Sequence, residues 1–226
     1  TEFALTTPTG DILTKNGLDL LVLPVSGRAP QYAGTISIPN GGGHLGDAIA
    51  QLGYTTHQQI LAESELVVTD RPTAEVLRWV RAGGSLLFLS NGASPFFWCQ
   101  SRGGTYGGSW ISNYSWLRPG VHRRLTTSNP LTLPFRAIMP HYTITGLPFE
   151  DARFQGDFLA GQISGWVQLP AAHTVQFRYG SGKVIMTTFH LEQPLSQGDP
   201  VAVAMFHDLV DYLLSDECQP KLTANL

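Results

Sequence analysis

Continuous apolar runs of strand length alternate along the chain with segments whose apolar residues recur at helical spacing. Runs of this kind, bounded by Gly, Ser or Asp, are typical of parallel strands that are buried on both faces. They lie at residues 18–25, 35–38, 66–69, 85–90 and 183–189. Helical spacing is found at residues 44–53, 73–82 and 200–213. The alternation predicts an α/β fold in which helices cover a mostly parallel sheet.

Two stretches predict local structure in more detail. Residues 65–90 read as strand, helix, Gly83-Gly84 and strand, which predicts a βαβ unit with a right-handed crossover. In the last helix we expect Asp199 to be the N-cap and Pro200 to occupy the first helical position.

The regular alternation is interrupted between about residues 91 and 180. Residues 91–120 have little periodicity and are rich in glycine and aromatic side chains, while residues 121–180 read as short β segments broken by prolines. Irregular segments of this length are usually functional in compact domains. The aromatic residues are Phe96, Phe97, Trp98, Tyr106, Trp110, Tyr114 and Trp116. We therefore expect a single domain over residues 1–226, with an insertion at about 91–180.

Charge is distributed unevenly along a chain whose net charge is only −3. Residues 76–149 contain seven arginines and no Asp or Glu, so this stretch supplies neither the paired acids of a glycosidase nor a hard-cation site. If this stretch binds a charged ligand, we expect that ligand to be a small anion. The alternative is a solvated arginine surface that pairs with acids elsewhere. Scattered arginines and three lysines predict no nucleic-acid binding, and no apolar run is long enough for a membrane span.

Two further features of the sequence, the pair of cysteines and a glycine-rich segment, do not predict a functional site. Cys99 and Cys218 are 119 positions apart, which predicts two independent buried thiols and neither a disulfide framework nor a metal site. Residues 41–46 satisfy G-x-G-x-x-G before a helix, but the segment that follows lacks the acid that a dinucleotide site uses on the ribose. A close-packed glycine turn is the preferred interpretation, and no cofactor is predicted.

Residues whose side chains could be catalytic follow the ends of two predicted strands. The strand at 85–90 ends in Ser90-Asn91-Gly92, and the strand at 183–189 is followed by His190 and Glu192. Ligands of open α/β sheets bind beyond the carboxyl ends of the strands, so these groups are expected at one edge. A hydroxyl, a histidine base and an orienting carboxylate make up a nucleophilic triad. In the alternative interpretation Ser90 caps a turn, and His190 and Glu192 are ordinary strand-end residues.

These residues resemble those of class I glutamine amidotransferases. His190-Leu191-Glu192 resembles that family's Phe-His-Pro-Glu segment, and Ser90-Asn91-Gly92 resembles its Cys-x-Gly nucleophile turn. Ser90 stands where the family has cysteine and Leu191 where it has proline, which argues against glutaminase activity.

A longer resemblance, over roughly residues 65–215, is to the amidotransferase-like domains associated with glycoside hydrolases and with trehalose-utilisation-type proteins. It rests on ELVVTDRPTAEVLRWVRAGGSLLFLS, YGSGKVIMTTFHLE and DPVAVAMFHDLVDYLL. The resemblance implies a flavodoxin-like three-layer sandwich, and such domains commonly lack a triad.

Two functions follow as hypotheses. The first is a non-catalytic or degenerate domain that binds carbohydrate, or a partner domain of a carbohydrate-processing protein. Its expected ligand-binding residues are Trp98, Arg102, Tyr106, Trp110, Trp116 and Arg118. The alternative is a serine hydrolase of amides or esters, in which Ser90 is the nucleophile, His190 the base and Glu192 the orienting group. The Asn91 amide would be an oxyanion donor, and Arg102 or Arg118 would receive a substrate carboxylate.

The same aromatic, acid-free region also has the composition of an interface core. We therefore expect association through residues 96–124, either between copies of the chain or with a parent polypeptide. A small-molecule pocket formed by the same loop is the competing interpretation.

Overall fold

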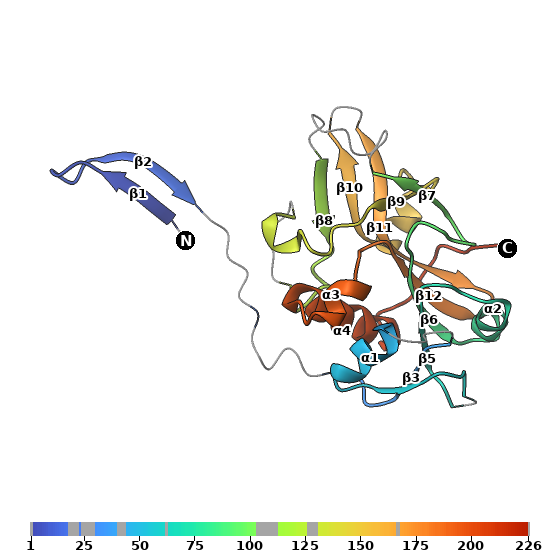
Figure 1. Cartoon of the computed structure of the whole chain (residues 1–226). Helices are drawn as coiled ribbons and strands as arrows, with labels where there is room; N and C mark the ends of the chain where they lie inside the picture. The colour runs from blue at the N-terminus through green and yellow to red at the C-terminus, as the bar shows by residue number, and fades with distance from the viewer. Residues whose placement is uncertain are drawn as a thin grey trace.

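The computed structural model describes residues 2–17, 23, 30–39, 44–61, 63–102, 113–125, 131–165 and 168–225. Within them the strands form two sheets (Figure 1). The smaller sheet is an antiparallel hairpin of β1 (Glu2–Thr6) and β2 (Ile12–Gly17), and the larger one has ten strands. The strand predicted for residues 18–25 lies outside the described residues, apart from Leu23.

One half of the large sheet is parallel, as predicted. Its strands, in spatial order, are β4 (Thr55–His57), β3 (Thr35–Ser37), β5 (Leu66–Thr69), β6 (Ser85–Leu89) and β12 (Gly182–Thr187). The predicted βαβ unit is confirmed: α2 (Ala74–Arg81) connects β5 to its parallel neighbour β6. Because β6 and β12 pair directly, Ser90 and His190 follow adjacent strands.

The other half of the sheet is antiparallel and comes from the insertion. It contains β7 (Trp98–Ser101), β8 (Asn113–Leu117), β9 (Tyr142–Thr145), β10 (Phe158–Ser164) and β11 (Leu169–Tyr179), with the short helices η2 (Leu133–Phe135) and η3 (Ala152–Asp157) between them. The sheet is therefore mixed. This stretch extends the sheet instead of standing beside it as short segments, because β11 pairs with β10 through its first part (residues 169–175) and with β12 through its second part (residues 174–179).

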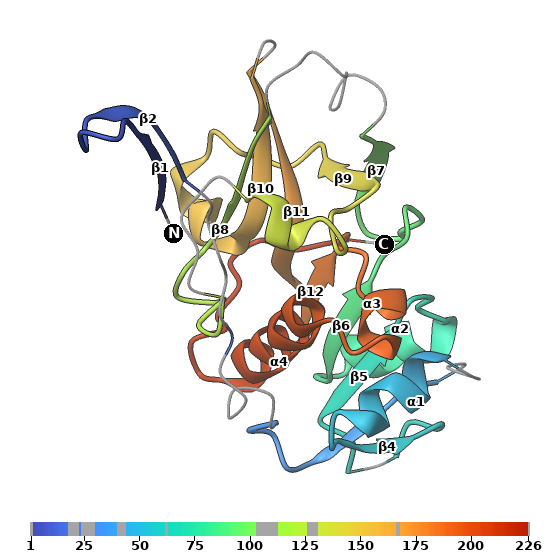
Figure 2. The ribbon, with the colours of Figure 1, turned by 60° about the vertical axis from the view of Figure 1, so that its left-hand side comes forward.

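Helices lie on both faces of the parallel strands, which gives a three-layer α/β arrangement (Figures 1 and 2). Leu87 and Ile185 belong to the core beneath α1 (His44–Gln51), α3 (Glu192–Ser196) and α4 (Pro200–Leu214). The next residue on each strand, Phe88 and Met186, belongs to the core beneath α2. This change of face with each residue buries both sides of the sheet.

The last helix begins as the sequence predicts. The Asp199 carboxylate accepts hydrogen bonds from the backbone N–H groups of Val201 and Ala202, each at 2.9 Å, and Pro200 occupies the first helical position. Among the described residues, no helix combines the length and the apolar character needed to cross a membrane.

Candidate functional site

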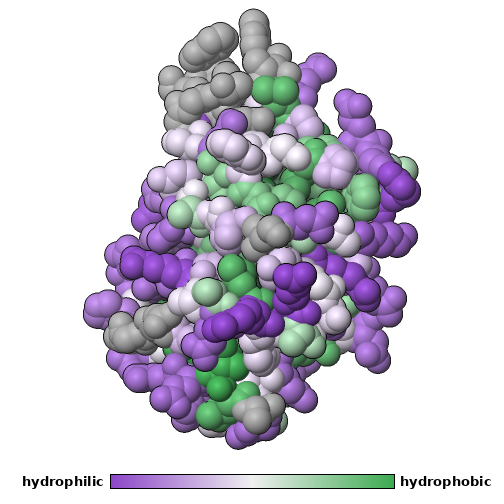
Figure 3. Space-filling view, turned by 90° about the vertical axis from the view of Figure 1, so that its right-hand side faces the viewer, coloured by the Kyte–Doolittle hydropathy of each residue, from purple (hydrophilic) through white to green (hydrophobic). Residues whose placement is uncertain are grey.

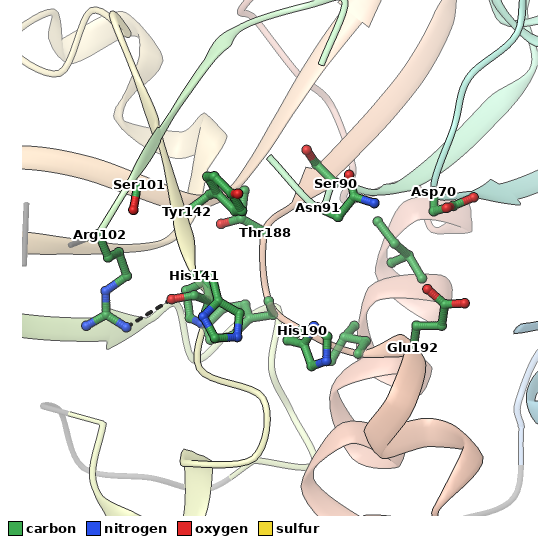
Figure 4. Close-up of a pocket in the computed structure, with 14 residues that line it drawn as sticks. Asp70, Ser90, Asn91, Ser101, Arg102, His141, Tyr142, Thr188, His190 and Glu192 are labelled. Carbon is green, nitrogen blue, oxygen red and sulfur yellow. Dashed lines mark hydrogen bonds between the residues drawn. The ribbon is translucent and has the colours of Figure 1, made fainter. Parts of the chain in front are cut away.

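A pocket of about 810 Å³ lies at the carboxyl ends of three neighbouring parallel strands. Asp70 follows β5, Ser90 and Asn91 follow β6, and the segment 188–192 follows β12. Parallel strands present their carboxyl ends at one edge of a sheet, which is where ligands bind in α/β folds. The structure thus brings Ser90, Asn91, His190 and Glu192 together around one pocket (Figure 4).

The insertion supplies the wall opposite these strand ends. Ser101 and Arg102 come from the end of β7, and His141 and Tyr142 from the start of its antiparallel partner β9. The Arg102 backbone N–H donates to the His141 carbonyl at 2.9 Å, which keeps the two segments in register. The His190 N–H donates to the Ile138 carbonyl at 2.9 Å and so connects this wall to the β12 side.

Ser90 is buried, and its hydroxyl takes part in the turn that follows β6. The Oγ donates to the Ala93 carbonyl at 3.1 Å and accepts from the Gly92 N–H at 3.4 Å. In Figure 4 the Ser90 side chain points away from His190. Among the described residues, no hydrogen bond joins Ser90 to His190. This is the geometry of a serine that caps a turn.

His190 and Glu192 also have separate surroundings. The His190 ring meets the His141 ring edge to face, with 5.7 Å between centroids. Glu192 is exposed in the first turn of α3, and no hydrogen bond within the described residues joins it to His190. Ser90, His190 and Glu192 therefore share a pocket without being linked to one another.

Tyr142 and Gly92 pack closely at the pocket wall. Gly92 has a φ of +107°, and a Cβ atom there would lie 2.6 Å from the Tyr142 ring. The absence of a side chain at Gly92 lets the Tyr142 ring lie against the turn after β6. An aromatic face is thereby placed beside the polar strand ends.

Asp70, His141 and Tyr142 are among the lining residues that the sequence analysis did not single out. Asp70 follows a buried strand just as Ser90 does, so the same strand-end rule could have found it. His141 precedes the short strand β9 and Tyr142 is its first residue, and no local pattern points to either of them. They reach the pocket only because β9 pairs with β7.

The predicted ligand-binding residues are distributed over different parts of the molecule. Arg102 lines the pocket, whereas Trp98 lies on β7 with 81% of its surface exposed. Trp116 is half-buried against the core beneath α2. Arg118 donates from Nε to the Phe158 carbonyl at 3.1 Å and from its terminal nitrogen to the Gln155 carbonyl, so it ties β8 to the segment before β10.

Tyr106, Trp110, Gly41 and Gly43 lie outside the described residues, whereas Gly46 of the G-x-G-x-x-G segment lies in α1. Residues 103–112 of the interface expected over residues 96–124 are also outside them, and that interface stays a prediction. Figure 3 shows the side of the molecule that lies on the right in Figure 1, where β7 and α2 are placed. Apolar side chains gather in the upper half of this face and hydrophilic ones surround them.

Neither cysteine is in a disulfide. Cys218 is buried, and burial raises the pKa of its thiol to about 11. Cys99 is half-buried with its sulfur 3.8 Å from Ser90 Oγ, and burial raises its pKa as well, which disfavours the nucleophilic thiolate. Within the described residues, no three or more His, Cys, Asp or Glu side chains gather as a metal site requires.

Comparison with known proteins gives only distant similarities. No protein-family model and no curated protein matches the chain. Among solved structures, a ThuA-like protein from Bacteroides uniformis aligns with 83% of this chain and 93% of its own, at 9% identity and a TM-score of 0.42. An exo-β-1,4-mannosidase from Opitutaceae bacterium strain TAV5 aligns with 82% of this chain but 36% of its own, at 15% identity and a TM-score of 0.37. Both TM-scores are below 0.5, which is too low to establish a shared fold or function.

Proposed function

We propose that this chain is a degenerate amidotransferase-like domain that binds carbohydrate in the pocket at the strand ends, without cleaving it. The observation that carries the proposal is the contrast between Ser90 and its neighbours. The Ser90 hydroxyl is engaged in its own turn. Within the described residues, the side chains of Asn91, His141, His190 and Glu192 make no hydrogen bond.

The pocket has the chemistry that a sugar requires. Each sugar hydroxyl donates and accepts, so it is matched by a wall that holds carboxylates, an amide and imidazoles together. Asp70, Asn91, His190 and Glu192 supply those groups, and Tyr142 supplies an aromatic face for the apolar side of a ring. The volume of about 810 Å³ lies within the range of small-molecule sites, roughly 300–1,000 Å³.

A serine hydrolase is the second candidate. It is favoured by the presence of Ser90, His190 and Glu192 in one pocket, with the Asn91 amide next to the turn. It would require the Ser90 hydroxyl to leave the Ala93 carbonyl and rotate toward His190. Catalytic hydrogen bonds can tighten when substrate binds, so the two candidates are distinguished by experiment.

Calorimetric titration with neutral mono- and disaccharides, run beside a chromogenic ester and amide assay, tests the proposal. We expect one or more sugars to bind, and Asp70→Asn and Tyr142→Ala each to weaken that binding by about tenfold, the ratio for one lost hydrogen bond or ring contact of about 1.4 kcal/mol. Asp216→Asn, an exposed change beyond the far end of α4, is the control for surface charge.

Ser90→Ala separates the two candidates. As a turn residue, Ser90 can be replaced with a loss of about 1 kcal/mol of stability and no loss of sugar binding. Ester or amide hydrolysis by the wild-type protein that disappears in Ser90→Ala would establish the hydrolase instead. If sugar binding is unaltered by Asp70→Asn and by Tyr142→Ala, the sugar does not bind in this pocket.

A further inference from the structure

Arg102 lines the pocket, and its guanidinium uses few of its hydrogen-bond donors within the described residues. It is half-buried just beyond β7, and one terminal nitrogen donates to the Pro140 carbonyl at 3.2 Å. Its Nε is buried and has no hydrogen-bond partner among the residues that the structure describes. The guanidinium forms no ion pair with any Asp or Glu among the described residues. A guanidinium has five donors and stays charged at every physiological pH, so most of this donor capacity is unused.

The stretch of chain around Arg102 supplies no acid to neutralise this charge. Arg102 lies inside residues 76–149, which contain no Asp or Glu in the sequence. His173 is fully buried, and burial together with the Arg102 charge lowers the pKa of this histidine to about 3. A half-buried, unpaired cation is costly, and an anion of the ligand would relieve that cost.

The two acids of the pocket are placed and compensated differently. In Figure 4, Asp70 and Glu192 lie at one end of the pocket and Arg102 at the other, with His141 and His190 between them. Asp70 already has a cation, because Arg71 Nε lies 3.3 Å from its carboxylate. Glu192 is exposed and therefore solvated. The charge of the pocket that lacks an oppositely charged partner among the described residues is therefore the positive charge of Arg102.

We propose that the ligand of this pocket is an acidic sugar of the uronic acid type, whose carboxylate pairs with Arg102 while its ring hydroxyls face Asp70, Asn91 and Glu192. The assignment rests on the carbohydrate-binding function proposed above. A planar carboxylate matches the fork of one guanidinium in a bidentate pair. A sugar phosphate fits less well, because it carries nearly two negative charges against one cation and two acids.

Matched pairs of sugars test the assignment on the full chain. The probes are D-glucuronate with D-glucose, D-galacturonate with D-galactose and D-mannuronate with D-mannose, each titrated calorimetrically at low and high salt. We expect the uronate of at least one pair to bind about tenfold or more tightly than its neutral partner, the ratio typical of one hydrogen-bonded charge pair. High salt is expected to reduce this preference and to leave the neutral sugar unaffected.

Variants at Arg102 identify the group responsible. Arg102→Gln should abolish the preference for the uronate, because it weakens binding of the uronate far more than binding of the neutral sugar, and Arg102→Lys should keep part of the preference through its charge. Arg136→Gln is the matched control, since Arg136 is an exposed arginine of the same acid-free stretch that does not line the pocket. Thermal unfolding of each variant shows whether it is folded.

The outcomes separate this inference from the function on which it rests. Neutral sugar that binds as tightly as its uronate, or a preference that survives in Arg102→Gln, overturns the acidic sugar and leaves the carbohydrate site standing. Tighter binding of glucose 6-phosphate or L-glutamate than of any uronate also overturns it. If no sugar of either kind binds, both proposals fail together.

Discussion

At the scale of single residues, burial decides the protonation state of His173. His173 has no exposed surface, neither ring nitrogen has a hydrogen-bond partner, and its ring packs against Phe189 with 5.5 Å between centroids. Burial is the main cause of its low pKa of about 3, because the charged imidazolium would lose its hydration. His173 is therefore neutral in the folded protein at physiological pH.

This shift predicts how stability depends on pH. The pKa of His173 is about 3 when folded and roughly 6.5 when unfolded. Between these values the unfolded chain binds more protons, so the free energy of unfolding falls as the pH drops from about 6.5 toward 3, at up to about 1.4 kcal/mol per pH unit. Urea unfolding of wild type and His173→Phe over this range measures the effect. We expect a shallower slope in the variant.

Exposed His57 provides the comparison for His173. His57→Gln, which changes an exposed side chain, is measured over the same pH range as the surface control. A slope that is equally steep in His173→Phe and in the wild type would contradict the assignment.

At the scale of elements, the turn after β6 determines the shape of the pocket wall. Gly92→Ala would place a Cβ 2.6 Å from the Tyr142 ring at a φ of +107°. We expect a loss of about 1–3 kcal/mol in the free energy of unfolding, from backbone strain together with displacement of the ring. Sugar affinity should fall as well, because Tyr142 moves. Urea unfolding and calorimetric titration measure the two effects.

Gly146→Ala separates the two contributions. Gly146 also has a positive φ, +73°, but a Cβ there would meet no atom within 4 Å. This variant should lose stability from the backbone alone and keep its sugar affinity. Equal losses of affinity in both variants would show that the contact with Tyr142 is not the cause.

At the scale of the whole molecule, the hairpin of β1 and β2 is set apart from the packed core. Every residue of the two strands is exposed, including Phe3, Leu5, Ile12 and Leu13. An isolated two-stranded hairpin is at best marginally stable in water. Its apolar side chains contribute no buried area to the large sheet.

Removal of residues 1–17 is therefore expected to leave the thermal unfolding midpoint of the rest within about 2 °C, since 1 kcal/mol corresponds to roughly 2–4 °C in a chain of this size. Leu213→Ala is the reference variant: Leu213 is fully buried in α4, and its truncation is expected to lower the free energy of unfolding by about 2–5 kcal/mol. A drop after truncation that approaches that of Leu213→Ala would mean that the hairpin packs on the domain. Differential scanning calorimetry distinguishes the two.

Local patterns were sufficient for the parallel half of the fold. The apolar runs of β5, β6 and β12 and the Asp199-Pro200 start of α4 are encoded by neighbouring residues, and they were found where the sequence predicted them. The antiparallel half was not predictable in this way. Within β11, Thr174 and Gln176 are polar yet buried, because side chains far away in the sequence are their hydrogen-bond partners: the Thr174 hydroxyl lies 2.9 Å from that of Thr187, and Gln176 donates to the Asp157 carboxylate at 2.9 Å.

For the site, the sequence by itself determined which residues stand at the strand ends, since chain order and strand direction place Ser90, Asn91, His190 and Glu192 at one edge. Only the tertiary structure decided what those groups do. The Ser90 hydroxyl turned to the Ala93 carbonyl because a rotation about one bond, which no pattern encodes, satisfies the turn. Arg102 and Tyr142 reached the pocket because β7 pairs with β9, and the long-range register between two strands depends on packing that neighbouring residues do not specify.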